Sequence, residues 1–66
     1  MLNEIQKFRK GLKITQEELA KKVGVTRQTI ISIEQGRYIA SLSLALKIAN
    51  VFGVTVEDIF TLEEDD

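Results

Sequence analysis

The sequence predicts an all-α fold, a compact bundle of five short helices in a single domain. Three observations support this prediction. Apolar residues recur at spacings of three and four, and no long stretch alternates apolar and polar residues with the period of a strand. Threonine and serine precede several of these apolar stripes, and glycine follows them, as is typical of helix starts and stops. A length of 66 residues suits one domain.

Each helix is expected from one stripe of apolar side chains. The five helices are expected at residues 3–11, 16–23, 27–35, 42–52 and 56–61. In the same order, the stripes are Ile5, Phe8 and Leu12; Leu19, Ala20 and Val23; Ile30 and Ile33; Leu42, Leu46, Ala49 and Phe52; and Val56, Ile59 and Phe60.

Capping signals mark three of the helix starts. Thr15 and Glu18 have the spacing of a capping box, in which each side chain bonds to the backbone N–H of the other residue. Thr55 and Asp58 form a weaker version, and Ser41 is expected to cap the helix that follows it.

The tripeptide Gly-Val-Thr occurs at residues 24–26 and again at 53–55. Each copy predicts a helix stop, a buried valine and an N-cap threonine. The first copy links two helices through only three residues, which is the sequence form of a helix-turn-helix at about residues 16–35.

The net charge of −1 conceals two halves of opposite sign. Residues 1–38 hold eight Lys and Arg against four Glu, and residues 39–66 hold one Lys against six Asp and Glu. This distribution predicts an anion-binding N-terminal half. Residues 63–66 are expected to form a disordered acidic tail, which serves either solubility alone or a partner.

Several functional classes are disfavoured by composition. The chain has no cysteine and no histidine, so the commonest metal ligands and the commonest general base are absent. Neighbouring carboxylates such as Glu17 and Glu18 diverge by about 100° on a helix and do not face one substrate. We therefore expect no enzyme activity, no cofactor and no metal. Without an apolar membrane span or signal-peptide core, a cytoplasmic protein is expected.

The expected helix at 27–35 has two different faces. At about 100° per residue, one face carries Thr29, Ile30 and Ile33. The opposite face carries Arg27, Gln28, Ile31, Ser32 and Gln35. In the DNA major groove, arginine pairs with guanine, glutamine with adenine, serine with either kind of edge, and an aliphatic group with the thymine methyl. The alternative, that Ile31 and Ser32 are ordinary surface residues, stays open.

Residues 5–60 resemble the helix-turn-helix domain of phage repressor and Cro proteins, the family also called the xenobiotic-response-element type. The matching stretches are TQEELAKKVGVTRQTIISIEQGR and SLSLALKIANVFGVTVEDIF. The resemblance implies a lambda-repressor-like bundle over residues 1–62, with its third helix in the major groove. It also implies a homodimer on a palindromic double-stranded DNA operator, often acting as a transcriptional repressor.

The resemblance and the face of helix 27–35 together give candidate site residues. Base contacts are expected from Arg27, Gln28, Ser32 and Ile31. Phosphate contacts are expected from Gln16, Thr26, Thr29, Arg37 and Lys13, the last within a basic surface. The resemblance further implies a structural ion pair between Arg9 and Glu34. A dimer interface is expected at Val56, Ile59, Phe60 and Leu62, although these residues are also consistent with core alone.

The chain departs from the family pattern in the loop after this helix. Ile39 and Ala40 stand where many members have Asn-Pro, and Tyr38 is expected to pack under the loop. A second hypothesis is an antitoxin or co-regulator that acts mainly through a protein partner. It rests on the acidic end and on the C-terminal apolar stripe, and DNA binding does not exclude it.

Overall fold

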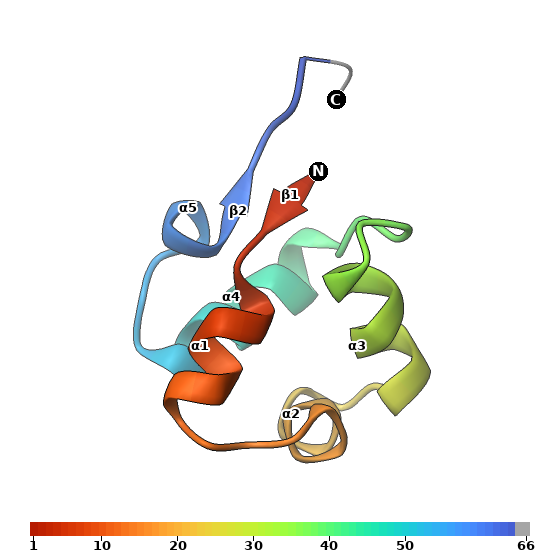
Figure 1. Cartoon of the computed structure of the whole chain (residues 1–66), viewed down its shortest axis with the longest axis vertical. Helices are drawn as coiled ribbons and strands as arrows, with labels where there is room; N and C mark the ends of the chain where they lie inside the picture. The colour runs from red at the N-terminus through yellow and green to blue at the C-terminus, as the bar shows by residue number, and fades with distance from the viewer. Residues whose placement is uncertain (65–66) are drawn as a thin grey trace.

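The computed structural model describes residues 1–64, which form five helices and one small sheet (Figure 1). In chain order the elements are β1 (Leu2–Asn3), α1 (Ile5–Gly11), α2 (Gln16–Val23), α3 (Arg27–Glu34), α4 (Leu42–Phe52), α5 (Val56–Ile59) and β2 (Phe60–Thr61). The five-helix bundle is confirmed, and the bounds predicted for α2 and α4 agree with the structure.

All five helices contribute to one core. The largest fully buried side chains are Ile5, Leu19, Ile30, Ile33, Ile48 and Ile59. α2 packs against both α3 and α4. The rings of Phe8 and Phe52 stack with their centroids 5.5 Å apart, which joins α1 to α4. The helix-turn-helix is therefore fixed to the rest of the domain mainly through α2.

The predicted capping boxes are both present. The Thr15 hydroxyl accepts from the Glu18 N–H at 3.0 Å, and the Thr15 N–H donates to the Glu18 carboxylate at 2.8 Å. Thr55 and Asp58 make the same reciprocal pair at the start of α5, and the Ser41 hydroxyl caps α4. Hydrogen bonding of the Glu18 carboxylate to Thr15, first to its backbone N–H and then to its hydroxyl, holds the pKa of Glu18 below its ordinary value.

The Glu18→Gln variant is expected to unfold with a weaker dependence on acid pH. Because the folded-state pKa of Glu18 is lowered, its contribution to stability is present above the unfolded-state pKa. That contribution is lost as the pH falls through the lower, folded-state pKa. Urea unfolding between about pH 6 and pH 3 measures the effect. Glu17→Gln, which removes a neighbouring carboxylate without this cap, should keep the wild-type steepness; equal curves for all three proteins would contradict the prediction.

Two short strands near the ends of the described chain pair with each other, and three of their four residues, Asn3, Phe60 and Thr61, were predicted as helix. Leu2 lies opposite Thr61 and Asn3 opposite Phe60 in an antiparallel pair, and the Glu4 N–H donates to the Ile59 carbonyl at 2.9 Å. α1 therefore starts later, and α5 ends earlier, than predicted. Strands of two residues are too short to produce a period-two pattern, so the sequence carried no signal for them.

Half of the apolar stripe predicted for α4 was wrong: Ala49 is buried and Phe52 packs against the core, as expected, but the two leucines do not face inward. Leu42 and Leu46 are 73% and 49% exposed. The buried residues of this helix are Leu44, Ala45, Ile48 and Ala49. α4 is apolar around most of its circumference, so spacing alone allowed more than one inward face. Leu12, the last residue of the first predicted stripe, is exposed as well.

Candidate nucleic-acid interface

The turn between α2 and α3 has the conformation that its Gly-Val-Thr sequence predicts. Gly24 is left-handed, with φ of 76°, and the Val25 N–H returns to the Ala20 carbonyl at 3.0 Å. The Thr26 hydroxyl then caps α3. Since glycine adopts this φ without steric cost, α2 ends and α3 begins within three residues. The second copy, at residues 53–55, turns α4 into α5 in the same way.

α3 has an apolar face and a polar face, as expected. Ile30 and Ile33 are buried in the core. Arg27 and Gln28 are exposed on the opposite side, whereas Ile31 is half-buried. Ser32 and Gln35 also lie on this outward side, half-buried and exposed respectively. The candidate base-contacting side chains therefore share one surface. Arg27 and Gln28 are more accessible on it than Ile31 and Ser32.

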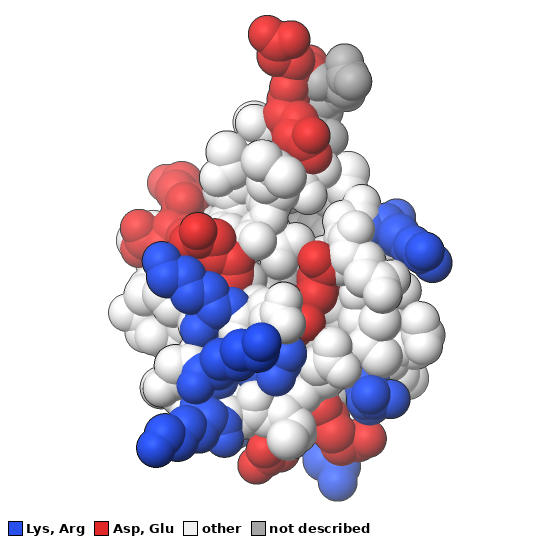
Figure 2. Space-filling model, viewed as in Figure 1, with Lys and Arg blue, Asp and Glu red and all other residues white. Residues whose placement is uncertain are grey.

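A basic hollow of about 710 Å³ lies where the turn between α1 and α2 meets the start of α3. It is lined by Arg9, Lys10, Lys13, Ile14, Thr15, Gln16, Glu17 and Arg27. Figure 2 shows Lys and Arg gathered over α1 and this turn, Asp and Glu over α5 and the C-terminal residues, and a smaller group of Asp and Glu at the lower edge, near α2. The charge asymmetry of the sequence is thus an asymmetry of the surface, and it favours anions at this end of the molecule.

The N-terminus of α2 opens into this basic hollow. The backbone N–H groups of Gln16 and Glu17 have no acceptor within residues 1–64, and they lie at the positive end of the helix dipole. The Gln16 side chain donates one N–H to Glu34 at 3.1 Å. A side-chain amide has two such hydrogens, so one remains to be donated outward.

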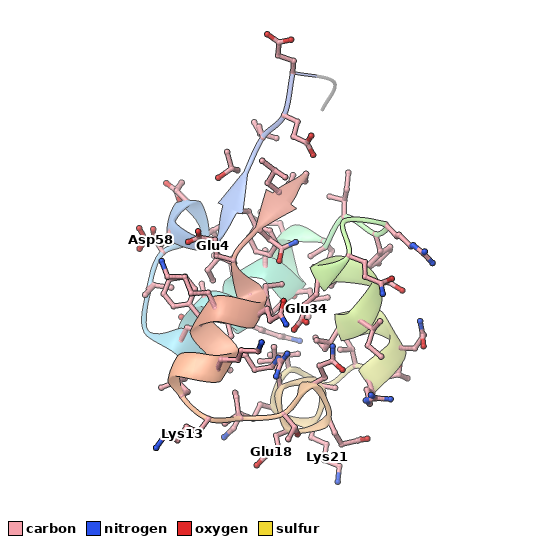
Figure 3. The ribbon with its side chains drawn as sticks, in the orientation of Figure 1. Glu4, Lys13, Glu18, Lys21, Glu34 and Asp58 are labelled. Atoms are coloured by element: carbon pink, nitrogen blue, oxygen red, sulfur yellow. The ribbon has the colours of Figure 1, made fainter. Side chains whose placement is uncertain are left out.

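The ion pair implied between Arg9 and Glu34 is present. Arg9 Nε donates to Glu34 Oε2 at 2.9 Å, and Arg9 also donates to the Ile14 carbonyl at 3.1 Å. The two side chains are only 11% and 8% exposed. Figure 3 shows Glu34 between α1 and α3. Because Gln16 bonds to the same carboxylate, this cluster links α1, α2 and α3 at one point.

Comparisons with known proteins assign the chain to a family. A family model described as helix-turn-helix matches residues 5–59. The chain belongs to this helix-turn-helix family. An uncharacterized HTH-type transcriptional regulator of Methanocaldococcus jannaschii is 56% identical over 66 residues, which cover 100% of both chains. The HTH-type transcriptional regulator YgzD of Bacillus subtilis is 47% identical, again over 100% of both chains.

Solved structures share the fold. The P22 c2 repressor, crystallised with a synthetic operator, has a TM-score of 0.77 and 28% identity over 80% of each chain. A chain of the SinR–SinI protein complex has a TM-score of 0.78 and 28% identity, covering 92% of this chain and 65% of that one. The resemblance to phage repressors and the lambda-repressor-like fold are both confirmed.

Lys13 has a left-handed backbone conformation, which the sequence did not predict. Its φ is 59°, which makes it the one non-glycine residue of positive φ within residues 1–64. The other left-handed positions are occupied by Gly24, Gly36 and Gly53, each just after a helix. A side chain with a Cβ atom costs about 1 kcal/mol in this conformation. The strained lysine lies on the rim of the basic hollow, and Figure 3 shows it pointing away from the core.

The hydroxyl groups at the start of α3 bond to each other. Thr26 Oγ1 and Thr29 Oγ1 are 3.0 Å apart, and only one of their two hydrogens fills this bond. The other hydrogen is left for an external acceptor.

Arg37, just after α3, is exposed, and its side chain makes no ion pair with any described residue.

Tyr38 does not pack under the loop, so that prediction was wrong. Its side chain is 49% exposed. The left-handed Gly36 turns the chain so that the N–H groups of both Arg37 and Tyr38 reach the Ser32 carbonyl, at 2.9 and 3.3 Å. These two bonds hold the backbone of Tyr38 beside the end of α3. The aromatic side chain stays exposed because of this backbone path.

Of the four residues predicted for a dimer interface, Ile59 is core alone, which is the alternative that the sequence left open. Ile59 is 1% exposed, because it is the inward residue of the single turn α5 and closes the core. Val56 and Phe60 are half-buried, and Leu62 is 72% exposed. These three line a mostly apolar groove of about 370 Å³, together with Met1, Ala40, Leu42, Ala45 and Glu57. An apolar surface is thus present on the side expected for dimerisation.

The predicted acidic tail lies partly outside the described residues. Asp65 and Asp66 fall outside residues 1–64, and Glu63 lies 3.0 Å from the N-terminal amine of Met1. The antitoxin or co-regulator hypothesis, with its protein partner, stays a prediction.

Within the described part of the chain, no cluster of three His, Cys, Asp or Glu is suited to a metal ion. No helix there has the length and hydropathy to cross a membrane.

Proposed function

We propose that this protein is a sequence-specific double-stranded DNA-binding transcriptional regulator, a cytoplasmic repressor without enzymatic activity. The observation that carries the proposal is the outward face of α3, with Arg27 and Gln28 exposed beside the basic hollow. The HTH-type regulators that match the whole chain, and the P22 c2 repressor crystallised with an operator, support it. In this arrangement α3 enters the major groove and the N-terminus of α2 faces the phosphate backbone.

The proposed contacts divide into two groups with different effects. The base contacts are Arg27, Gln28, Ser32 and Ile31, and the phosphate contacts are Gln16, Thr26, Thr29, Arg37 and Lys13. Phosphate contacts supply most of the affinity and its salt dependence, whereas base contacts supply the sequence preference.

Selection of bound sequences from a random duplex library, at moderate salt, tests the proposal. We expect one short half-site to be enriched, present twice with twofold symmetry and one helical turn between centres. If no sequence is enriched over random duplex, the proposal fails. An enriched single half-site would retain DNA binding and contradict the homodimer.

A homodimer through the apolar groove is part of this proposal. One α3 helix reads only a few base pairs, and a second copy doubles the reading length. Leu42 and Leu62 line the groove and, at 73% and 72%, are the most exposed large hydrophobic residues within residues 1–64.

The Leu42→Asp variant is expected to shift the protein from dimer to monomer. A carboxylate placed in an apolar contact is desolvated without a partner, which disfavours association. Sedimentation equilibrium over a concentration series measures the change. Leu46→Asp is the matched control, because Leu46 is exposed on the same helix but does not line the groove. Equal association constants for both variants would exclude the groove as the interface.

The Lys13→Gly variant is expected to be more stable and to bind DNA more weakly. Glycine relieves the left-handed strain, which should raise the free energy of unfolding by up to about 1 kcal/mol. Loss of the ammonium group should reduce the slope of log K against log salt by about 0.9 for one phosphate contact. Urea unfolding and salt-dependent titrations measure the two effects. Lys47→Ala is the control, because it removes a lysine from α4 without the loss of helix propensity that glycine would cause there. A salt slope for Lys13→Gly equal to that of the wild type would contradict a phosphate contact.

A further inference from the structure

A second hollow lies along α3, on the side away from the basic one. It measures about 240 Å³ and is lined by Thr26, Gln28, Thr29, Ser32 and Tyr38. All five side chains carry neutral hydrogen-bonding groups. Arg27 of the basic hollow and Ser32 of this one are five positions apart, which is about 140° around the helix. The two hollows therefore flank the outward face of α3, one cationic and one neutral.

Tyr38 is the wall of this neutral hollow that comes from the loop after α3. Backbone bonds to the Ser32 carbonyl hold its main chain in place, as described above. Its ring is half exposed, and its hydroxyl has no hydrogen-bond partner within residues 1–64. A phenolic hydroxyl in this state is a donor that is free to bond to a group outside the protein.

The geometry of the major groove indicates what the acceptor is. The groove is bounded by two phosphate backbones, and a helix that lies in it has one strand on either side. If the basic hollow faces one strand, the neutral hollow faces the other. We propose that the Tyr38 hydroxyl donates a hydrogen bond to a phosphate oxygen of that second strand. This inference rests on the proposed function, since it requires α3 to lie in the groove.

The Tyr38→Phe variant tests the proposal, because it removes the hydroxyl and keeps the ring. We expect about tenfold weaker binding, by the same factor on the selected site and on its single-base variants. The midpoint of urea unfolding should stay at the wild-type value. Thr61→Val, which removes an exposed hydroxyl from β2, is the control and should bind as the wild type does.

A methylphosphonate scan locates the acceptor. Each phosphate of the half-site is replaced in turn by an uncharged methylphosphonate, and wild type and Tyr38→Phe are titrated on each duplex. One position should remove the difference between the two proteins. If the difference persists at every position, or if the loss is confined to one base pair, the hydroxyl does not bind a phosphate and the proposal is overturned.

The composition of the chain adds a direct measurement. Tyr38 is its one tyrosine and there is no tryptophan, so tyrosine emission reports this side chain alone. Binding of the selected duplex should change that emission, and an unchanged signal at saturation overturns the proposal. Failure of wild type to select any sequence would instead remove the proposed function. Selective wild-type binding with equal affinity of Tyr38→Phe would remove only the Tyr38 contact.

Discussion

The Glu34→Gln variant is expected to lose about 3–5 kcal/mol of its free energy of unfolding. The substitution keeps the size of the side chain but removes its charge, which leaves the Arg9 guanidinium largely buried without a counter-ion. A loss of this size is a large part of the stability of a small domain. Urea unfolding followed by circular dichroism at neutral pH measures it, provided that the wild-type baseline is complete.

Two further variants separate charge burial from a general effect of substitution. Glu4→Gln breaks the exposed pair with Lys7, which has 3.6 Å between the charged atoms, and should cost less than about 1 kcal/mol. The double variant Arg9→Met with Glu34→Leu removes both charges and should recover most of the loss. If Glu34→Gln is no more harmful than Glu4→Gln, the buried pair does not stabilise the fold.

The position of Glu34 also explains why this pair matters for the interface. Its carboxylate receives hydrogen bonds from both Arg9 and Gln16, so one group fixes α1, the start of α2 and the end of α3. The basic hollow and the outward face of α3 meet across this cluster. We expect variants of Glu34 to alter the relative placement of phosphate and base contacts even where the protein stays folded.

The parts of the structure that the sequence predicted correctly depend on local chemistry. A capping threonine with an acidic residue three positions later, or a glycine after a helix, acts within one turn of chain. The sequence signal at residues 24–26 was therefore sufficient to predict the turn of the helix-turn-helix. The Arg9–Glu34 pair spans distant residues and was available only through the family resemblance.

The parts that the sequence did not predict depend on tertiary packing. Whether Leu42 or Leu44 faces the core is decided by how α4 lies against α2, because both residues are equally apolar. The early end of α5 is likewise a tertiary effect, because Phe60 and Thr61 pair with the N-terminal strand and do not continue the helix. Lys13 shows a different limit: the sequence offers Gly11 nearby, yet the left-handed position falls on the lysine.

The Gln28→Ala variant is expected to weaken binding to the selected site by about 1–3 kcal/mol and to relax the preference at one base position of each half-site. Gln28 is exposed at the start of α3, on the wall of the neutral hollow, where its amide can pair with both edge atoms of an adenine. Titration of wild type and variant, against the selected duplex and its three substitutions at each half-site position, measures both effects. The salt concentration is held constant throughout.

The pattern of loss identifies the kind of contact. Gln6→Ala, an exposed glutamine on α1, is the matched control and should bind the selected site as the wild type does. An equal loss on every duplex would make Gln28 a phosphate contact and contradict base reading. In a symmetric dimer each half-site contains the same contact, so relaxation should occur at two positions related by the twofold axis. Relaxation at only one of them would show that the two copies of α3 do not read equivalent sequences.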